Sequence, residues 1–217
     1  MKFVVTAGPT REHLDPVRFL SNPSTGRMGF EVARAARAAG YEVALVAGPV
    51  ALPTPKGVRR VDVTSAREML AAVRAELSCG GPCVLVMTAA VADWRPAKRV
   101  SRKLKKGEMS ATLALVRNPD ILKTVGRLAA VRVGFAAETG DPSAEALRKC
   151  REKKLDLVVA NDVTVPGAGF GTATNRVSFV TPDGRVRSLP LMTKAAVARR
   201  IVREAIGVAG NLTSRPL

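Results

Sequence analysis

Apolar and polar positions alternate along the chain in two distinct periods. Lys2 to Ala7 and Tyr41 to Ala47 are short β-branched apolar runs, each ended by a Gly-Pro pair, and both predict buried strands. Between them, residues 26–39 place apolar side chains at helical spacing, and Gly40 offers a C-terminal cap. These segments predict one strand–helix–strand unit.

The alternation then continues, and the pattern predicts helices over 65–77 and 143–154 and strands over 83–87, 131–136 and 155–160. Ser65 and Glu68 form a capping box at the first of these helices. A further helix start is predicted at Asn118-Pro119-Asp120, which offers a cap, a first-position proline and a first-turn acid in that order.

The C-terminal part follows a different pattern. Strand-like residues 176–180 and 185–190 flank Pro182-Asp183-Gly184, a turn signal that predicts an antiparallel hairpin. Thr193 then opens an amphipathic helix that we expect to end around Ala205. We expect residues 207–217 to form a frayed tail.

Strands that alternate with helices predict an α/β fold. The expected architecture is a Rossmann-like, three-layer, doubly wound and mostly parallel sheet with a C-terminal hairpin and a dimerisation extension. We expect one domain over residues 1–206, with its ligand site in the loops after the strands, because the carboxyl ends of parallel strands form the usual binding crevice.

Residues 94–107 fit neither period. They hold seven basic residues and no acid, and we expect them to form a mobile flap that an anion can order. The basic residues are Arg95, Lys98, Arg99, Arg102, Lys103, Lys105 and Lys106.

Charge narrows the choice of partners. The 217 residues include 35 Lys and Arg against 18 Asp and Glu, a formal net charge of +17. Such a surface attracts nucleic acid, whereas a basic cleft concentrates small phosphorylated substrates. Only 4% of the residues are aromatic, which disfavours a platform on which single-stranded bases stack.

Other chemistry is limited by residue counts. The single histidine, His13, excludes a His-rich metal site, and Cys79, Cys83 and Cys150 are expected to be reduced. The sequence holds no apolar run of about 18 residues that would span a bilayer, and Met1 is not followed by the pattern of a secretory signal. We therefore expect a cytoplasmic protein.

The loop and helix start from Ser21 to Gly29 is rich in small residues. Gly26 and Gly29 would let a phosphate approach the free amides of a helix N-terminus, or they serve only close helix packing. The full Gly-x-Gly-x-x-Gly pattern is missing, and the second strand ends at Gly48 without an acid for a ribose diol. These absences disfavour NAD.

Three further groups of residues are candidates for binding a cation or phosphates, and each also has a simpler interpretation. Thr88 to Asp93 ends a central strand, where Asp93 can hold a cation or simply cap the loop. Lys103 to Lys106 supplies positive charge for a triphosphate or is a solvated charge run. Lys149 and Lys153 stand at i and i+4, so they meet one ligand or form an exposed helix face.

Several motifs occur together in a fixed order. They are residues 6–12 (TAGPTRE), 14–22 (LDPVRFLSN), 89–93 (AAVAD), 118–121 (NPDI), 134–139 (GFAAET) and 155–161 (LDLVVAN). On these residues the chain resembles the bacterial phosphopantothenoylcysteine synthetases, also called phosphopantothenate–cysteine ligases, to about residue 206.

The resemblance implies a ligase of coenzyme A biosynthesis. Cytidine triphosphate (CTP) with Mg²⁺ would activate 4′-phosphopantothenate as an acyl-cytidylate, and L-cysteine would then displace CMP. It implies a homodimer through residues 111–116 and 176–190, and a separate decarboxylase as pathway partner. No flavin, NAD, specific nucleic acid or membrane partner is expected.

The resemblance also assigns site residues. The catalytic positions are Asn22 and Lys103, and the acid or its acyl intermediate would contact Arg18, Gly26, Gly29, Ala89 and Ala90. The nucleotide would contact Asp93, Lys103, Pro119, Asp120, Ile121, Leu122, Phe135, Lys149 and Lys153. No metal ligand is assigned, because Mg²⁺ is expected to bind mainly through the triphosphate.

Two residues depart from the family's usual sequence, and two alternative functions remain open. Thr25 and Arg27 stand where the family commonly has serine and lysine. The basic charge is compatible with a nucleotide- or nucleic-acid-binding protein without ligase activity, and the strand–helix pattern is compatible with a nicotinamide or flavin oxidoreductase.

Overall fold

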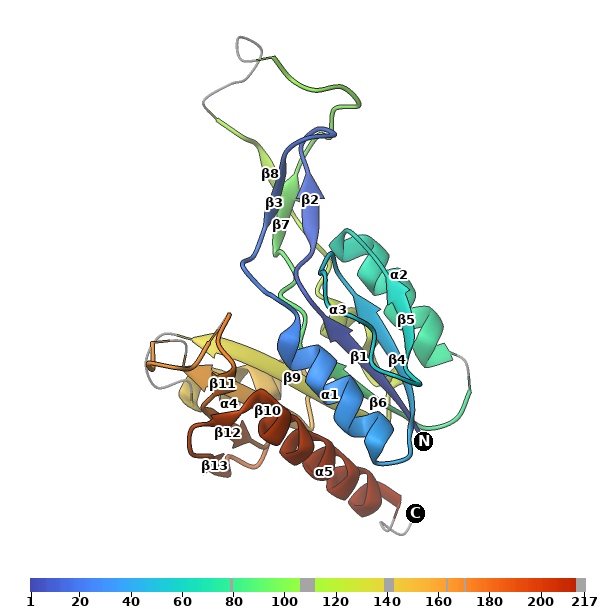
Figure 1. Ribbon diagram of the computed structural model, residues 1–217, viewed down its shortest axis with the longest axis vertical. Helices are drawn as coiled ribbons and strands as arrows, with labels where there is room; N and C mark the ends of the chain where they lie inside the picture. Colours follow the sequence, from blue (N-terminus) through green and yellow to red (C-terminus); the bar gives the residue numbers. More distant parts are fainter. Residues whose placement is uncertain (79, 106–111, 139–142, 163, 170, 214–217) are drawn as a thin grey trace.

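The protein is built around an eight-stranded sheet (Figure 1). The structure, a computed structural model, describes residues 1–78, 80–105, 112–138, 143–162, 164–169 and 171–213. The strand order is β13-β12-β10-β9-β6-β1-β4-β5. Its parallel strands are β1 (Lys2–Ala7), β4 (Glu42–Ala47), β5 (Arg59–Asp62), β6 (Cys83–Met87), β9 (Val131–Glu138) and β10 (Leu157–Asp162).

The predicted hairpin closes one edge of this sheet. Strand β12 (Val177–Val180) pairs antiparallel with β10 and with β13 (Val186–Ser188), and the turn lies at Pro182 to Gly184. The Rossmann-like, mostly parallel α/β fold is therefore confirmed. Strand β10 begins two residues later than the sequence predicts, because the Asp156 carboxylate accepts a hydrogen bond from the Arg132 amide and holds the preceding turn.

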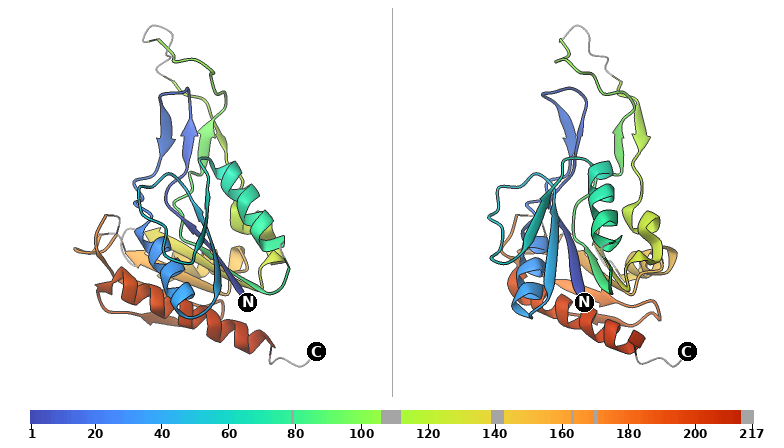
Figure 2. Two further views of the ribbon diagram at one scale, coloured as in Figure 1. Left: turned by 45° about the vertical axis from the view of Figure 1, so that its right-hand side comes forward. Right: turned by 90° about the vertical axis from the view of Figure 1, so that its right-hand side faces the viewer.

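Helices cover both faces of the sheet (Figure 2). One face carries α1 (Arg27–Ala38) and α5 (Lys194–Thr213), and the other carries α2 (Ala66–Ser78), α3 (Ile121–Val125) with a 3₁₀ turn (Gly126–Leu128), and α4 (Ser143–Glu152). None of the described helices is long and apolar enough to cross a membrane.

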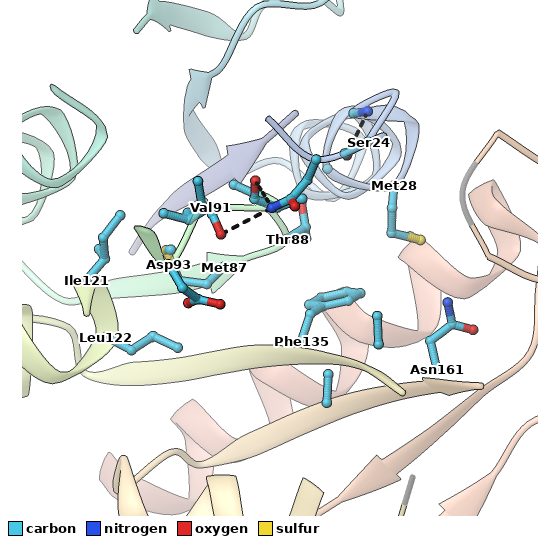
Figure 3. A pocket seen from close by; sticks show the side chains of 18 of the residues that line it. Ser24, Met28, Met87, Thr88, Val91, Asp93, Ile121, Leu122, Phe135 and Asn161 are labelled. Carbon is cyan, nitrogen blue, oxygen red and sulfur yellow. Dashed lines mark hydrogen bonds between the residues drawn. The ribbon is translucent and has the colours of Figure 1, made fainter. Parts of the chain in front are cut away.

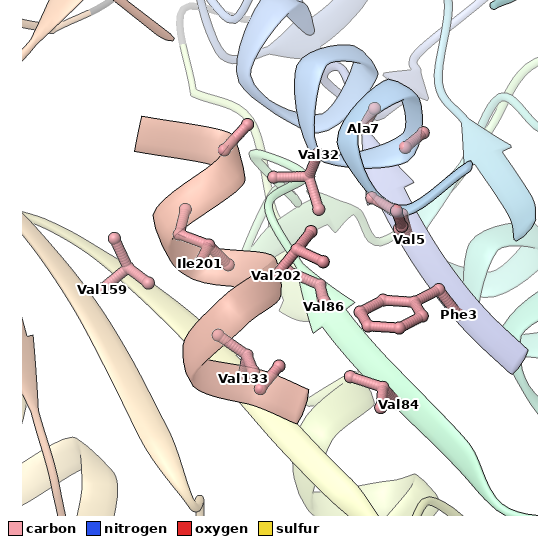
Figure 4. Close-up of a cluster of buried hydrophobic side chains, with 14 of the residues drawn as sticks. Phe3, Val5, Ala7, Val32, Val84, Val86, Val133, Val159, Ile201 and Val202 are labelled. Atoms are coloured by element: carbon pink, nitrogen blue, oxygen red, sulfur yellow. The ribbon is translucent and has the colours of Figure 1, made fainter. Parts of the chain in front are cut away.

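Alternate side chains of each strand fill two separate cores. Phe3 and Val5 point to the α1–α5 face, where they join Val32 and Ile201 (Figure 4), whereas Val4 joins the core under α2 and α3. Successive strand residues point to opposite faces, so an unbroken apolar run is what a sheet covered on both sides requires. The strand predictions rested on these runs.

Two small antiparallel ribbons rise from the sheet and lie side by side; we call them the arm (Figures 1 and 2). One ribbon pairs β2 (Arg11–His13) with β3 (Phe19–Ser21), and the other pairs β7 (Trp94–Pro96) with β8 (Leu115–Arg117). Three-residue strands leave no periodic signal, so the sequence predicted neither ribbon. The prediction that all of 94–107 lies outside regular structure was wrong for β7.

The remaining short strands are β11 (Thr174–Asn175) and β14 (Met192–Thr193), which pair beside the start of α5. Residues 97–105 form no helix or strand, and Lys106, at the end of the predicted flap, lies outside the described residues. The same holds for Ala111, where we placed the start of the dimerisation strand; the strand itself begins at Leu115.

Two helix ends differ from the prediction. Asp120, rather than Asn118, caps α3, because its carboxylate accepts the Lys123 amide hydrogen at 3.1 Å while the Asn118 amide donates to the Ala92 carbonyl at 2.8 Å. Helix α5 continues to Thr213 instead of ending near Ala205. Ile206 and Ala209 still pack on the core there, and this packing outweighs the helix-breaking tendency of Gly207.

Candidate active site

A cavity of about 770 Å³ opens at the carboxyl ends of the central parallel strands (Figure 3). The loop before α1, the loop after β6, the start of α3, and side chains from β9, β10 and α4 form its walls. This is the edge at which the parallel sheet predicted a ligand site.

The two glycines at the start of α1 play different roles. Gly26 is the helix N-cap and has a left-handed φ of 77°, and no side chain caps the first turn. A Cβ on Gly29 would collide with the Thr88 hydroxyl and the Ala7 methyl group. Gly29 therefore serves close packing of α1 onto the strand ends, as one of the two interpretations held, and this packing brings the helix N-terminus to the cavity wall.

Asn22 connects this wall with the loop after β6. Its Nδ2 donates to the carbonyls of Ala90 at 3.1 Å and Val91 at 3.3 Å (Figure 3). The backbone amides of Ala89 and Ala90 are themselves used, donating to the Thr6 hydroxyl and the Gly8 carbonyl. A substrate oxygen that accepts from Asn22 would therefore have to replace one of its two carbonyl contacts.

The α3–α4 end of the cavity holds paired charges. Lys153 Nζ lies 2.8 Å from an Asp120 oxygen, and Lys149 Nζ lies 3.2 Å from Glu138 Oε1. Burial would raise the pKa of Asp120, but hydrogen bonds from Lys153 and the Lys123 amide outweigh it and lower that pKa. Both lysines are partly exposed and line the cavity, an arrangement that favours their meeting one ligand.

The cavity brings most of the predicted residues together. Those that line it are Asn22, Gly26, Gly29, Ala89, Ala90, Asp93, Pro119, Asp120, Ile121, Leu122, Phe135, Lys149 and Lys153. Arg18 and Lys103 do not line it. Arg18 sits on the arm, where its guanidinium donates to the Asp15 carboxylate and the Leu104 carbonyl, and Lys103 is exposed next to that contact.

The opposite end of the cavity contains three residues that were not among the predicted site positions, although one of them, Asn161, belongs to the motif at 155–161. Asn161, Asn175 and Lys194 are all buried and all line it. Asn161 lies near the end of the buried strand β10 and ends the motif at 155–161, and a polar residue at that position is a signal that could have been used. Asn175 and Lys194 lie at short strand and helix boundaries that give no such signal.

These features define a class before any comparison is made. The protein is a Rossmann-like domain whose strand-end cavity offers an uncapped helix N-terminus and lysines, the groups that bind phosphates. Its family is also clear. The chain belongs to the DFP family, described as the DNA/pantothenate metabolism flavoprotein C-terminal domain, whose model matches residues 1–208.

Known relatives agree with this assignment. The chain is 46% identical over 213 residues to the coenzyme A biosynthesis bifunctional protein CoaBC of Vibrio vulnificus strain YJ016, covering 96% of this chain and 52% of that protein. It is 46% identical over 204 residues to CoaBC of Bacillus subtilis strain 168, covering 93% and 50%. The chain thus spans about half the length of these curated relatives.

Solved structures show the same fold. The crystal structure of the C-terminal domain of a CoaBC matches with a TM-score of 0.79 and 39% identity, over 99% of this chain and 96% of that one. A Cab2 mutant in complex with phosphopantothenate-cysteine matches with a TM-score of 0.80 over 98% and 87% of the two chains. At 18% identity, the second match shows the fold alone.

Proposed function

We propose that this chain is a phosphopantothenate–cysteine ligase of coenzyme A biosynthesis. The observation that carries the proposal is the meeting of thirteen predicted site positions in one cavity, with Asn22 and the Ala89–Ala90 loop between the α1 N-terminus and the α3–α4 end. Membership of the family supports it. The acid would lie toward α1 and the nucleotide toward α3 and α4.

The reaction would proceed in two steps. In the first, a carboxylate oxygen of 4′-phosphopantothenate attacks the α-phosphorus of CTP and pyrophosphate leaves. In the second, the amine of L-cysteine attacks the acyl carbon, CMP leaves with the C–O electrons, and the nitrogen loses a proton. The first step is needed because a free carboxylate is a poor electrophile, and groups placed where charge develops accelerate both steps.

The residues present fit the expected Mg²⁺. Within the described ranges no cluster of three His, Cys, Asp or Glu side chains forms a closed metal site. Asp93 lines the cavity as a carboxylate, whereas Asp120 and Glu138 are engaged by lysines. Mg²⁺ commonly binds through one or two carboxylates and substrate phosphates, so Asp93 would hold it, and it would offset triphosphate charge.

The arm suggests how the site is completed. Several apolar side chains of the arm and the edge strand are exposed, among them Phe19, Trp94, Leu115 and Val186. Exposed apolar patches of this kind mark protein interfaces. We infer that two chains pair through these surfaces, and that an arm from the second chain delivers Lys103 to the cavity that its own chain does not reach.

The test is pyrophosphate release. The purified protein should release pyrophosphate only when both CTP and 4′-phosphopantothenate are present, and should form the amide after L-cysteine is added. Omitting each substrate in turn is the control. Failure to release pyrophosphate, combined with retention on DNA that falls steeply with salt, would instead support a nucleic-acid-binding protein.

A further inference from the structure

One polar atom of the cavity has no partner. Asn161 is 8% exposed, and its Oδ1 is the one buried side-chain oxygen or nitrogen atom in the described part of the chain that lacks a hydrogen bond. A buried acceptor without a donor costs roughly 1–3 kcal/mol. Such a cost is typical of a site that a ligand completes, because buried polar groups are otherwise satisfied.

The position of Asn161 defines what reaches it. The side chain rises from near the end of β10 into the cavity, beyond the Phe135 ring and below Met28 in Figure 3. Phe135 separates it from Asp93, Ile121 and Leu122 at the opposite side of the same view. Asn161 therefore lies at the end of the cavity away from α3, where the proposed function places the acid.

The wall behind Asn161 is fixed. Lys194 is 6% exposed, and its Nζ donates to the carbonyls of Gly169 at 2.9 Å and Thr172 at 2.8 Å. Asn175 Oδ1 accepts hydrogen bonds from the amides of Arg176 and Gly169. These contacts hold the loop against α5, so the end of the cavity is built in advance of any ligand.

Lys194 brings positive charge to this end of the cavity. Burial, together with the nearby positive charge of Arg27, lowers the pKa of Lys194. Within the ranges that the structure describes, no carboxylate forms an ion pair with this ammonium group, in contrast to Lys149 and Lys153. An anionic ligand that bears a hydrogen-bond donor suits these surroundings.

We propose that Asn161 is a specificity-determining residue whose Oδ1 accepts a hydrogen bond from the middle of an extended anionic acid, with Lys194 behind it. The inference rests on the proposed function. 4′-Phosphopantothenate offers two donors there, a secondary hydroxyl beside two methyl groups and an amide N–H. Phe135 and Met28 line the same part of the cavity and offer apolar surface for the methyl groups near the acceptor.

The experiment combines a variant with a changed substrate. Asn161→Leu keeps a similar shape and removes the acceptor, and it should raise the KM for 4′-phosphopantothenate roughly 5- to 150-fold while the KM for CTP changes less than about twofold. An analogue without the secondary hydroxyl, or one with a methylated amide, should impair the wild type by a similar factor. Whichever of the two analogues impairs the wild type should impair Asn161→Leu far less, because this variant has already lost the acceptor.

Stability provides a second readout. Without substrate, Asn161→Leu should melt at the same temperature as the wild type or higher, because the unsatisfied acceptor is gone. Ser178→Ala is the matched control, since it removes a partly exposed side chain that is hydrogen-bonded to Ser188 from β12, the strand next to β10. Asn161→Ser serves the kinetic test if the leucine variant does not fold.

The outcomes separate this inference from the proposed function. A wild-type protein that releases no pyrophosphate overturns the ligase proposal itself. A wild-type protein that is active, together with an Asn161→Leu variant that keeps its KM for the acid, overturns only the role of Asn161. Equal sensitivity of both proteins to both analogues also overturns it, as does a fall in melting temperature with unchanged kinetics.

Discussion

The two ends of the cavity hold their charges in opposite ways. At the α3–α4 end, three lysines line the cavity, and each is matched by a carboxylate: Lys123 by Glu152, Lys149 by Glu138 and Lys153 by Asp120. At the α5 end, Lys194 contacts only backbone carbonyls among the described residues, and Asn161 keeps an unused acceptor. The lysines of one end are therefore ion-paired before a ligand arrives, whereas Lys194 at the other end has no carboxylate partner among the described residues.

This difference teaches how each end would select its ligand. A triphosphate carries enough charge to take lysines from their carboxylate partners, so an ion-paired end keeps those side chains ordered without blocking the ligand. A buried, unpaired end instead rejects any molecule that lacks the right polar group. The α5 end is therefore suited to distinguish between similar ligands, and the α3–α4 end is suited to bind a highly charged ligand.

Asn22 lies where the two ends meet, and changing it should have the largest effect. Asn22→Asp places a negative charge where an oxyanion would form when cysteine attacks, so amide formation should slow by roughly 10²–10³-fold. Activation of the acid should slow less. Single-turnover experiments that trap the cytidylate before and after cysteine is added separate the two steps; equal slowing would make Asn22 a general binding residue.

Lys103 tests whether the cavity is completed from outside. We expect Lys103→Gln to slow pyrophosphate release by roughly 10- to 100-fold, because the triphosphate gathers charge as pyrophosphate leaves. Lys105→Gln is the matched control and should have a smaller effect, because neighbouring positive charges on one segment can replace each other. An unchanged rate for Lys103→Gln would show that this lysine is only a solvated charge.

A mixing experiment identifies which chain supplies the lysine. Lys103→Gln and Asn22→Asp chains are each impaired alone. If the arm of one chain serves the cavity of the other, mixed dimers contain one site with both native residues, and formation of the amide product should exceed the sum of the two variants. No gain on mixing, in dimers shown to have exchanged chains, would mean that each arm serves its own cavity.

The sequence predicted the parts of the molecule whose side chains repeat. Buried strands such as Lys2–Ala7 have unbroken apolar runs, and Ser65 and Glu68 form their predicted capping box, with the Glu68 amide donating to the Ser65 hydroxyl. The arm could not be predicted, because its strands have three residues each and its two ribbons, from residues 11–21 and 94–117, come together only in the fold. Helix α5 ran longer than predicted because packing of Ile206 and Ala209 opposes Gly207.

The residues of the site also fall into those that the sequence predicted and those that it did not. Motif residues such as Asn22 and Phe135 were found from the resemblance, and the structure brings them to one cavity. Asn161 and Lys194 come together only through the fold, since one lies near the end of β10 and the other begins α5. No spacing in the chain relates them, so a sequence-based search had no reason to pair them.

The paired end of the cavity should respond to loss of its lysines in binding alone. Replacing both Lys149 and Lys153 by alanine should raise the KM for CTP by roughly 10-fold, since each lysine would supply a charge-assisted contact to phosphate. The KM for the acid should stay nearly constant. The melting temperature should fall little, because partly exposed ion pairs contribute about 1 kcal/mol or less. A large fall in melting temperature would mean that these lysines are structural.

The smallest expected effect is the acid sensitivity of Asp120. Its pKa is lowered in the folded protein, because hydrogen bonds from Lys153 and the Lys123 amide outweigh the effect of burial. The folded state therefore binds this proton less readily than the unfolded state, so Asp120 stabilises the fold above the ordinary aspartate pKa of about 4 and loses this contribution as the pH falls through the lowered pKa.

Denaturant unfolding measures this contribution. The free energies of unfolding of the wild type and Asp120→Asn should differ by about 1 kcal/mol or less near neutral pH, because a third of the side chain is exposed. That difference should shrink below about pH 4. A difference that stays constant with pH would show that Asp120 acts only as the helix cap, a role that asparagine also fills. Its pairing with Lys153 would then contribute nothing to the stability of the folded protein.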